Sequence, residues 1–417
     1  MNMNPTEVFI AEYDYALPTD RIAAHPLDER DASKLLIYKE GQVEISKFKD
    51  LVNQLPENAT LVINDTKVIQ ARLFFQKETG GQIEIFCLSP YLPAEMTASL
   101  SSSGIVQWNC MIGGASKWKP GQILNKKLSI DDSHFDLSAR FVGKSGDQFI
   151  IEFSWNSTHS FAEVLHTAGN IPLPPYIKRK VGTTDVERYQ TVFAEHEGSV
   201  AAPTAALHFT PFVFDQLAQK GISTTRLTLH VGAGTFKPVK SETIADHDMH
   251  AENFTVTATS LQSLISAEVI VAVGTTSLRT LESLYWIGIK LLKGHKEMNL
   301  KQWDALDFAE AATISYKESL QVLLNWLASS GQQQLYCSTS LLIMPGYEIR
   351  SAHALITNFH QPRSTLLLLV AAFTGGDWKN IYEHALSNAF RFLSYGDSSL
   401  LWRPLPASPK GRLASSH

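Results

Sequence analysis

The fold class is indicated most clearly by one stretch of sequence, Glu268-Val-Ile-Val-Ala-Val-Gly-Thr-Thr-Ser-Leu-Arg-Thr-Leu-Glu-Ser-Leu-Tyr-Trp286. A β-branched run ends at Gly274, and Leu278, Leu281, Leu284 and Tyr285 then recur at helical spacing. This pattern predicts a strand over residues 268–273 and a helix over 277–286. Further strands are predicted at 60–65, 225–231, 341–344 and 354–357, and further helices at 160–167, 212–220, 365–374 and 378–392. Strands that alternate with helices in this way indicate an α/β architecture.

Residues 73–155 follow a different pattern. The segments 82–88, 106–112 and 148–154 alternate roughly with period two and are separated by Gly and Ser turns, with no helical period between them. We therefore predict an α/β main domain, formed by residues 1–72 and 156–417, with an inserted all-β domain over residues 73–155. The inserted domain should be a small antiparallel, barrel-like sheet. Residues 287–338 are polar and are predicted to form a mostly helical excursion of the main domain.

The composition is that of a soluble globular protein. The chain has 417 residues, of which 44% are hydrophobic and 18% charged, which is enough for two or three domains. No long apolar run opens the chain, and the longest one, residues 366–373, is too short to span a bilayer, so we expect a cytoplasmic protein without a membrane partner. The three cysteines form no CxxC pair, which argues against a disulfide framework, a zinc ribbon or an iron–sulfur cluster. A net charge of −5 counts against nucleic-acid binding unless positive charge gathers on one face.

Two glycine-containing segments are candidates for ligand binding. Gly232 and Gly234 form a GxG after a predicted strand, without the third glycine of a dinucleotide fingerprint. They either admit a ligand against bare backbone or simply form a tight turn. Thr275 and Thr276 open the 277–286 helix, where free N–H groups bind anions and Arg279 could add a bidentate clamp. The alternative is that Thr276 or Ser277 only caps the helix.

Other polar clusters are weaker signals. Asp246-His-Asp-Met-His250 and Glu252 could ligate a metal by residue type, but no second cluster has matching spacing. We therefore favour hydrogen-bonded histidines and expect no metal. The basic run Ile177-Lys-Arg-Lys180 follows a rigid proline turn and is either a phosphate contact or a solvated face. Small residues surround His208 in the segment 199–210, which would let a ligand approach closely.

Taken in order, these segments resemble the S-adenosylmethionine:tRNA ribosyltransferase-isomerases of queuosine biosynthesis. The resemblance runs from about Tyr13 to Leu401 and rests on many motifs in one order. They include Asn64-Asp-Thr-Lys-Val-Ile69, Ile171-Pro-Leu-Pro-Pro-Tyr-Ile177, Gly198-Ser-Val-Ala-Ala-Pro-Thr204, Leu229-His-Val-Gly-Ala-Gly-Thr-Phe236, Gly274-Thr-Thr-Ser-Leu-Arg279, Thr357-Asn-Phe-His360 and Arg391-Phe-Leu-Ser-Tyr-Gly-Asp397. The chain departs from the family pattern at Ala206, at His353, at Ser398-Ser399 and in the longer 287–338 excursion.

The resemblance implies a reaction and a set of roles. The family transfers the ribosyl group of S-adenosylmethionine onto 7-aminomethyl-7-deazaguanine at the tRNA wobble position, giving epoxyqueuosine with release of adenine and methionine. A general base must remove a proton beside the sulfonium, and the methionine carboxylate needs a cation or a helix terminus. The candidates are His208 and His230 for proton transfer; Gly232, Gly234, Thr275, Thr276 and Arg279 for S-adenosylmethionine; and Lys178, Arg179, Arg188 and Asp397 for tRNA, the last of these for the deazaguanine edge.

Two other functions stay open at this point. The departures could mark a diverged paralogue that binds tRNA without catalysis. A different S-adenosylmethionine-dependent transferase, such as a methyltransferase, is disfavoured by the missing Rossmann glycine pattern. No feature of the sequence indicates an oligomeric state.

Overall fold

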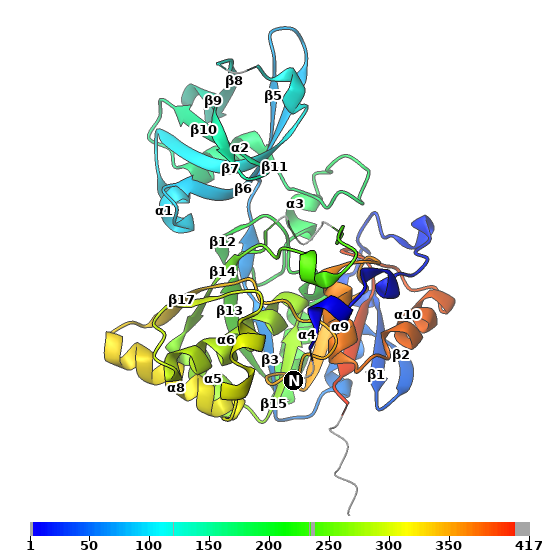
Figure 1. Cartoon of the computed structure of the whole chain (residues 1–417). Helices are drawn as coiled ribbons and strands as arrows, with labels where there is room; N and C mark the ends of the chain where they lie inside the picture. Colours follow the sequence, from blue (N-terminus) through cyan, green and yellow to red (C-terminus); the bar gives the residue numbers. More distant parts are fainter. Residues whose placement is uncertain (1–2, 120, 233, 235–237, 405–417) are drawn as a thin grey trace, which may run out of the picture.

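The computed structural model describes residues 3–119, 121–232, 234 and 238–404. Within these residues the fold is mixed α/β, with a large sheet and a curled, antiparallel seven-stranded sheet (Figure 1). The large sheet has the strand order β16-β17-β14-β13-β3-β15-β18-β19-β1-β2, and the small one β11-β5-β6-β7-β10-β9-β8. A two-stranded pair, β12-β4, lies where the two sheets approach each other.

The strands of the large sheet are β1 (Lys34–Lys39), β2 (Gln42–Lys47), β3 (Ala59–Asn64), β13 (Ser223–Leu229), β14 (Glu252–Thr257), β15 (Val269–Val273), β16 (Asn299–Leu300), β17 (Gln334–Thr339), β18 (Ala354–Asn358) and β19 (Ser398–Trp402). Those of the small sheet are β5 (Arg72–Gln76), β6 (Gln82–Leu92), β7 (Ile105–Gly113), β8 (Ile123–Ile130), β9 (Ser133–Ser145), β10 (Gln148–Trp155) and β11 (Gly169–Asn170). The linking pair is β4 (Thr66–Val68) and β12 (His196–Ser199). The α-helices are α1 (Met96–Ser101), α2 (Phe161–Ala168), α3 (Asp185–Arg188), α4 (Pro211–Gln219), α5 (Ala258–Ser266), α6 (Thr275–Leu292), α7 (Asp304–Asp307), α8 (Tyr316–Ser330), α9 (Thr365–Phe373) and α10 (Trp378–Ser387).

Four parallel strands form the centre of the large sheet. β13, β3, β15 and β18 lie side by side and run in the same direction. Every residue of β3 is buried, because the sheet is covered on both faces. Val62 packs into the core that contains α6, whereas Leu61 and Ile63 pack into the core that contains α4. The carboxyl ends of these four strands therefore meet at one edge of the sheet.

The small sheet has a core of its own, built around Trp108, Phe153 and Phe161. Residue 155 is too early a boundary for this unit, because α2 and β11 follow it and still belong to the small sheet. The apolar side of α2 (Phe161, Val164 and Leu165) is buried in that core. The expectation of no helix over residues 73–155 is also wrong, since α1 forms there with Glu95 accepting from the N–H groups of its first turn.

The 287–338 excursion is only partly a separate feature. α6 continues past Trp286 to Leu292, and Ile287 and Ile289 are fully buried, so the excursion begins inside a core helix. The segment then forms β16, α7 and α8 and returns as β17, which pairs with β14 in the large sheet. The strand predicted at 341–344 is a buried loop instead, and α10 ends at Ser387 rather than at residue 392. Among the described residues, no helix is both long enough and apolar enough to cross a bilayer.

Candidate functional site

Polar segments follow all four central strands at the same edge of the sheet. Asp65 follows β3, His230 follows β13, Gly274 follows β15, and Asn358 ends β18. Ligands of open α/β sheets bind at the carboxyl ends of parallel strands, where the chain turns to either side. The candidate site is therefore at this edge, although the chemistry differs from one strand end to the next.

A cavity of about 70 Å³, which we call the strand-end cavity, lies at this edge. The segments 201–205, 274–276 and 357–361 and the residue Ser394 line it, and none of the described residues in its lining is an Asp, Glu, Lys or Arg. A second cavity of about 310 Å³ shares Thr275, Thr276 and Leu366 with it. Gly234 and Arg279 line the second cavity. Four of the five residues proposed for S-adenosylmethionine thus lie around two adjoining spaces.

The N-terminus of α6 opens on the strand-end cavity. Gly274 precedes the helix with a φ of 92°, a conformation that favours glycine, and no side chain caps the helix there. The Ser277 hydroxyl donates back to the carbonyl oxygen of Val273 at 2.8 Å, and Thr276 makes no capping bond. The alternative that Thr276 or Ser277 caps α6 is therefore wrong, and no side chain among the described residues caps the first N–H groups, which suit an anion.

β18 supplies two buried polar groups to the same cavity. The Asn358 side-chain oxygen accepts a 2.8 Å hydrogen bond from the Thr204 hydroxyl, whereas its Nδ2 has no partner among the residues that the structure describes. His360 Nε2 lies 2.9 Å from the Thr357 hydroxyl, and burial lowers the pKa of His360 to about 3. The His360 ring is therefore neutral at physiological pH. The Thr357-Asn-Phe-His360 motif was visible in the sequence, but nothing local indicated that Asn358 and His360 line a cavity.

Two of the cofactor candidates, Gly232 and Arg279, meet at one buried carboxylate. Arg279 forms an ion pair with Glu252, and the Gly232 N–H donates to Glu252 Oε1 at 2.9 Å. Burial lowers the pKa of Arg279 to about 10, which leaves the guanidinium charged. Because Glu252 already balances this charge, Arg279 is not a free clamp as the sequence suggested. A Cβ on Gly234 would lie 2.6 Å from Cδ2 of the exposed His250, so a side chain at this position would displace that ring.

His208 does not face a cleft lined by small groups, as its flanking residues had suggested. Its ring is 5% exposed and packs on Phe48, with ring centroids 5.1 Å apart. It borders a cavity of about 20 Å³ whose lining includes Arg30, Arg188 and Arg391. Burial lowers the pKa of His208 to about 4, and its Nε2 has no hydrogen-bond partner in the described part of the chain.

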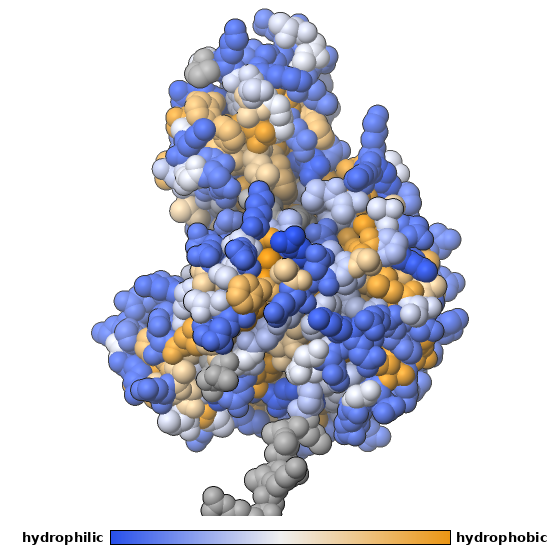
Figure 2. Space-filling model, turned by 45° about the vertical axis from the view of Figure 1, so that its right-hand side comes forward, coloured by the Kyte–Doolittle hydropathy of each residue, from blue (hydrophilic) through white to orange (hydrophobic). Residues whose placement is uncertain are grey.

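His230 lines a different and much larger groove. This groove, of about 1500 Å³, lies between α1 of the small sheet and the exposed side of β13, β14 and β17. Figure 2 shows the hollow between the lobe of the small sheet and the larger lobe. His230 Nδ1 lies 3.0 Å from the Thr66 hydroxyl, and its pKa is lowered to about 4 by burial and by the nearby His196. The two candidate histidines are therefore in separate spaces.

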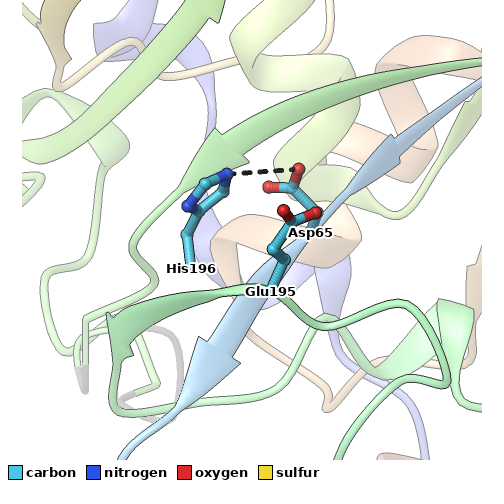
Figure 3. A group of neighbouring side chains, drawn as sticks. All are labelled: Asp65, Glu195 and His196. Atoms are coloured by element: carbon cyan, nitrogen blue, oxygen red, sulfur yellow. Dashed lines mark ion pairs between the residues drawn. The ribbon is translucent and has the colours of Figure 1, made fainter.

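Three possible cation ligands lie together in this groove, Asp65, Glu195 and His196 (Figure 3). Their ligand atoms all lie within 4.8 Å of one another. Burial raises the pKa of Asp65, and this effect outweighs the hydrogen bond from Thr228, which lowers the pKa. Glu195 is paired with Arg226 at 2.6 Å, so both carboxylates already have protein partners. Among the described residues this is the only such group, and the 246–252 segment forms none.

The residues proposed for tRNA have unequal roles. Lys178 is exposed, whereas both Nη atoms of Arg179 bind the buried Asp185, at 2.6 and 2.7 Å. Arg188 donates to the carbonyl oxygens of Leu27 and Asp28. Arg179 is thus part of an ion pair within the protein.

Asp397, predicted for the deazaguanine edge, is held by groups of the protein. Its side chain is almost fully buried and accepts from the backbone N–H groups of Lys34 and Arg391, at 3.1 and 2.8 Å. The Arg391 guanidinium adds an ion pair at 3.3 Å. These partners hold the Asp397 carboxylate in place within the protein.

Comparisons with known proteins extend over the same residues. The family model described as "Queuosine biosynthesis protein" matches residues 10–401. The S-adenosylmethionine:tRNA ribosyltransferase-isomerase of Azoarcus sp. (strain BH72) is 37% identical over 399 residues, which cover 94% of this chain and 97% of that protein. The enzyme of the same name from Thermotoga petrophila is 37% identical over 403 residues, 94% of this chain and 99% of that protein.

A solved structure is also similar. The crystal structure of S-adenosylmethionine tRNA ribosyltransferase from Thermotoga maritima is 28% identical, with 94% of this chain and 99% of that chain covered and a TM-score of 0.44. The family match and the identities to full-length relatives agree with the order of motifs read from the sequence. The chain therefore belongs to the queuosine biosynthesis family of S-adenosylmethionine:tRNA ribosyltransferase-isomerases.

Proposed function

We propose that this chain transfers and isomerises the ribosyl moiety of S-adenosylmethionine onto 7-aminomethyl-7-deazaguanine at the tRNA wobble position. The products are epoxyqueuosine in tRNA, adenine and methionine. One observation carries the proposal beyond family membership: segments 201–205, 274–276 and 357–361, each part of a resemblance motif, line one cavity at the ends of the parallel strands. Ligand binding at this edge is the general property of such sheets.

S-adenosylmethionine is proposed to occupy the two adjoining cavities. Thr275 and Thr276 lie at their junction, with the α6 N-terminus available to an anionic group. The larger cavity, beside Gly234, has room for a nucleoside. Arg279 and Glu252 together present a neutral pair to it, so this pair would orient a polar group instead of neutralising a charge.

A neutral histidine is proposed to move the proton. His208, His230 and His360 each have a pKa lowered to about 3 or 4, with burial as the largest cause, so each is an unprotonated acceptor at neutral pH. Replacing the active one by glutamine should lower turnover by about two to four orders of magnitude. The other two variants should retain most of the activity.

Positive charge beside the His208 cavity is proposed to contact tRNA phosphates. Arg30, Arg188 and Arg391 surround this cavity, and the pKa of Arg30 is lowered by burial and by the neighbouring charge of Arg188. Added phosphate would relieve that repulsion, and the exposed Lys178 could extend the contact. The large groove suits phosphates less, because four acidic residues line it: Asp65, Glu95, Glu195 and Glu197.

The seven-stranded sheet, residues 72–170, is proposed to be an inserted domain that helps to hold tRNA over the main domain. Its own core and its place as a separate lobe in Figure 1 support this. We further propose that the protein acts in the cytoplasm, and we expect it to need no metal. S-adenosylmethionine is then a co-substrate.

The departures from the family pattern do not favour a non-catalytic paralogue. His353 Nδ1 accepts from the Ile270 N–H at 3.1 Å, which ties the starts of β18 and β15 together away from both cavities. Ala206 is fully buried in the core beside α4, and Ser398 and Ser399 are buried in β19. The test is an incubation with S-adenosylmethionine and tRNA that carries the aminomethyl base. Release of adenine would support the proposal, and release of S-adenosylhomocysteine would indicate a methyltransferase.

A further inference from the structure

Asn358 presents an unused hydrogen-bond donor to the strand-end cavity. The residue is 3% exposed, and its Nδ2 has no partner among the described residues. Thr204 holds the amide in one orientation, because its hydroxyl donates to Asn358 Oδ1 at 2.8 Å. A buried amide N–H₂ without a partner is costly, so such a group in a cavity indicates a ligand that accepts its hydrogen bonds.

The rest of the cavity also favours a ligand that accepts hydrogen bonds. The first turn of the 18-residue helix α6 faces it through Gly274, Thr275 and Thr276, without a side-chain cap. A helix N-terminus carries about half of a positive elementary charge. Among the described residues no acidic side chain lines the cavity, so none of the lining side chains that the structure describes offsets this positive potential. The matching ligand is a small anion with acceptor oxygens.

We propose that Asn358 and the N-terminus of α6 bind the carboxylate of the methionine part of S-adenosylmethionine, with Thr204 as the positioning residue. This inference rests on the proposed function and names the group that the strand-end cavity holds. A cavity of about 70 Å³ accommodates a carboxylate. A phosphate of tRNA fits less well, because no Lys or Arg lines the cavity within the part of the chain that the structure describes.

The test compares two ligands that differ only in this carboxylate. S-adenosylmethionine and its decarboxylated analogue share the adenosine, the sulfonium and the amine. Their dissociation constants are measured on the full-length protein by calorimetry, without tRNA and with saturating tRNA. Wild type should prefer S-adenosylmethionine. Asn358→Ala should lower that preference about 10- to 100-fold, the usual effect of losing a hydrogen bond to a charged group.

Two further variants sharpen the comparison. Thr204→Val should lower the preference in the same direction, because the Asn358 amide loses its support. Thr210→Val is the matched control: Thr210 is a nearby threonine that caps α4 and does not line the cavity, so the preference should be unchanged. A thermal melt of each variant shows whether it is folded. If the alanine variant unfolds, Asn358→Asp replaces it in the comparison, because aspartate keeps the side-chain size and should repel the carboxylate.

The outcomes separate this inference from the proposed function. If Asn358→Ala weakens both ligands equally, or weakens neither, the carboxylate does not bind at Asn358 and the inference is wrong. If wild type releases adenine but shows no preference between the two ligands, the inference fails and the proposed function stands. If wild type binds neither ligand even with tRNA, the proposed function itself fails.

Discussion

Arg179 and Lys178 are neighbours in the sequence but should respond to substitution in opposite ways. Removing the Arg179 side chain leaves Asp185 buried without its cation, since the Asp185 side chain is only 1% exposed. Loss of one partner of a buried pair costs about 3–5 kcal/mol. Asp185 would keep hydrogen bonds from the Gly182 N–H, at 2.7 Å, and the Tyr395 hydroxyl, at 2.9 Å. We therefore expect Arg179→Ala to lower the free energy of unfolding by about 3 kcal/mol, near the lower end of that range.

The pH dependence adds an independent check. Burial alone would raise the pKa of Asp185, but the hydrogen bonds from Arg179, Gly182 and Tyr395 outweigh it and hold this pKa below its usual value. In wild type, the stability from Asp185 is present above its unfolded pKa of about 3.9 and is lost as the pH falls through the lower folded value. In Arg179→Ala, burial dominates and the carboxyl protonates more readily. The cost of the substitution should therefore shrink on acidification.

Urea unfolding and tRNA binding at several salt concentrations measure these effects. Lys178→Ala should leave the unfolding free energy within about 0.5 kcal/mol of wild type. If Lys178 contacts a phosphate, its removal should also reduce the slope of log K against log salt by about 0.7 to 0.9. Arg179→Ala should leave the slope unchanged. An Arg179→Ala variant that is as stable as wild type and has a reduced slope would refute the structural role of the ion pair.

Two further predictions concern the histidines and the glycines. Burial lowers the pKa values of His208 and His360 to about 4 and about 3, so the folded state resists protonation of both rings. The protein should therefore be most stable above the unfolded histidine pKa of about 6.5 and should lose stability as the pH falls below that value. Each of these two histidines should lower the free energy of unfolding by about 1 kcal/mol near pH 5.5, as measured by urea titration. His208→Gln should remove the contribution of His208, and an unchanged pH profile in that variant would contradict this. Gly234→Ala should lower the affinity for S-adenosylmethionine in calorimetry, because the added Cβ would displace His250. Gly232→Ala should bind S-adenosylmethionine nearly as wild type does, because its Cβ would have only an ordinary 3.7 Å contact with Glu252. Equal affinity in both glycine variants would contradict the close packing at Gly234.

The elements that could be predicted from the sequence are those with a strong local period. β15 and α6 were recognisable because a doubly buried strand runs directly into a helix with a continuous apolar face. β6, β7 and β10 were recognisable from their period of two. α2 was predicted as a helix but assigned to the wrong unit, because an amphipathic helix does not reveal which core buries it. β19 was missed because it is defined by pairing with β1 and β18, which are distant in sequence.

In the candidate site, too, the residues that could be predicted from the sequence are those with a local signal. Glycines and hydroxyls at strand ends pointed to Thr275 and Thr276, which line the strand-end cavity, because turn chemistry is local. The charged residues were harder to interpret, since the partner of a charge depends on the fold. Asp397 is held partly by the backbone N–H of Lys34, which no sequence spacing predicts. Asn358 was overlooked for a related reason, because only the cavity shows that its amide has no partner.

The most direct test of the central claim is the product balance of a single incubation. The full-length protein is mixed with S-adenosylmethionine and with tRNA that carries 7-aminomethyl-7-deazaguanine, and both the small molecules and the tRNA nucleosides are quantified by mass spectrometry. The account predicts adenine, methionine and epoxyqueuosine in equal amounts. Formation of S-adenosylhomocysteine with a methylated nucleoside, or tRNA binding with no adenine released, would contradict it.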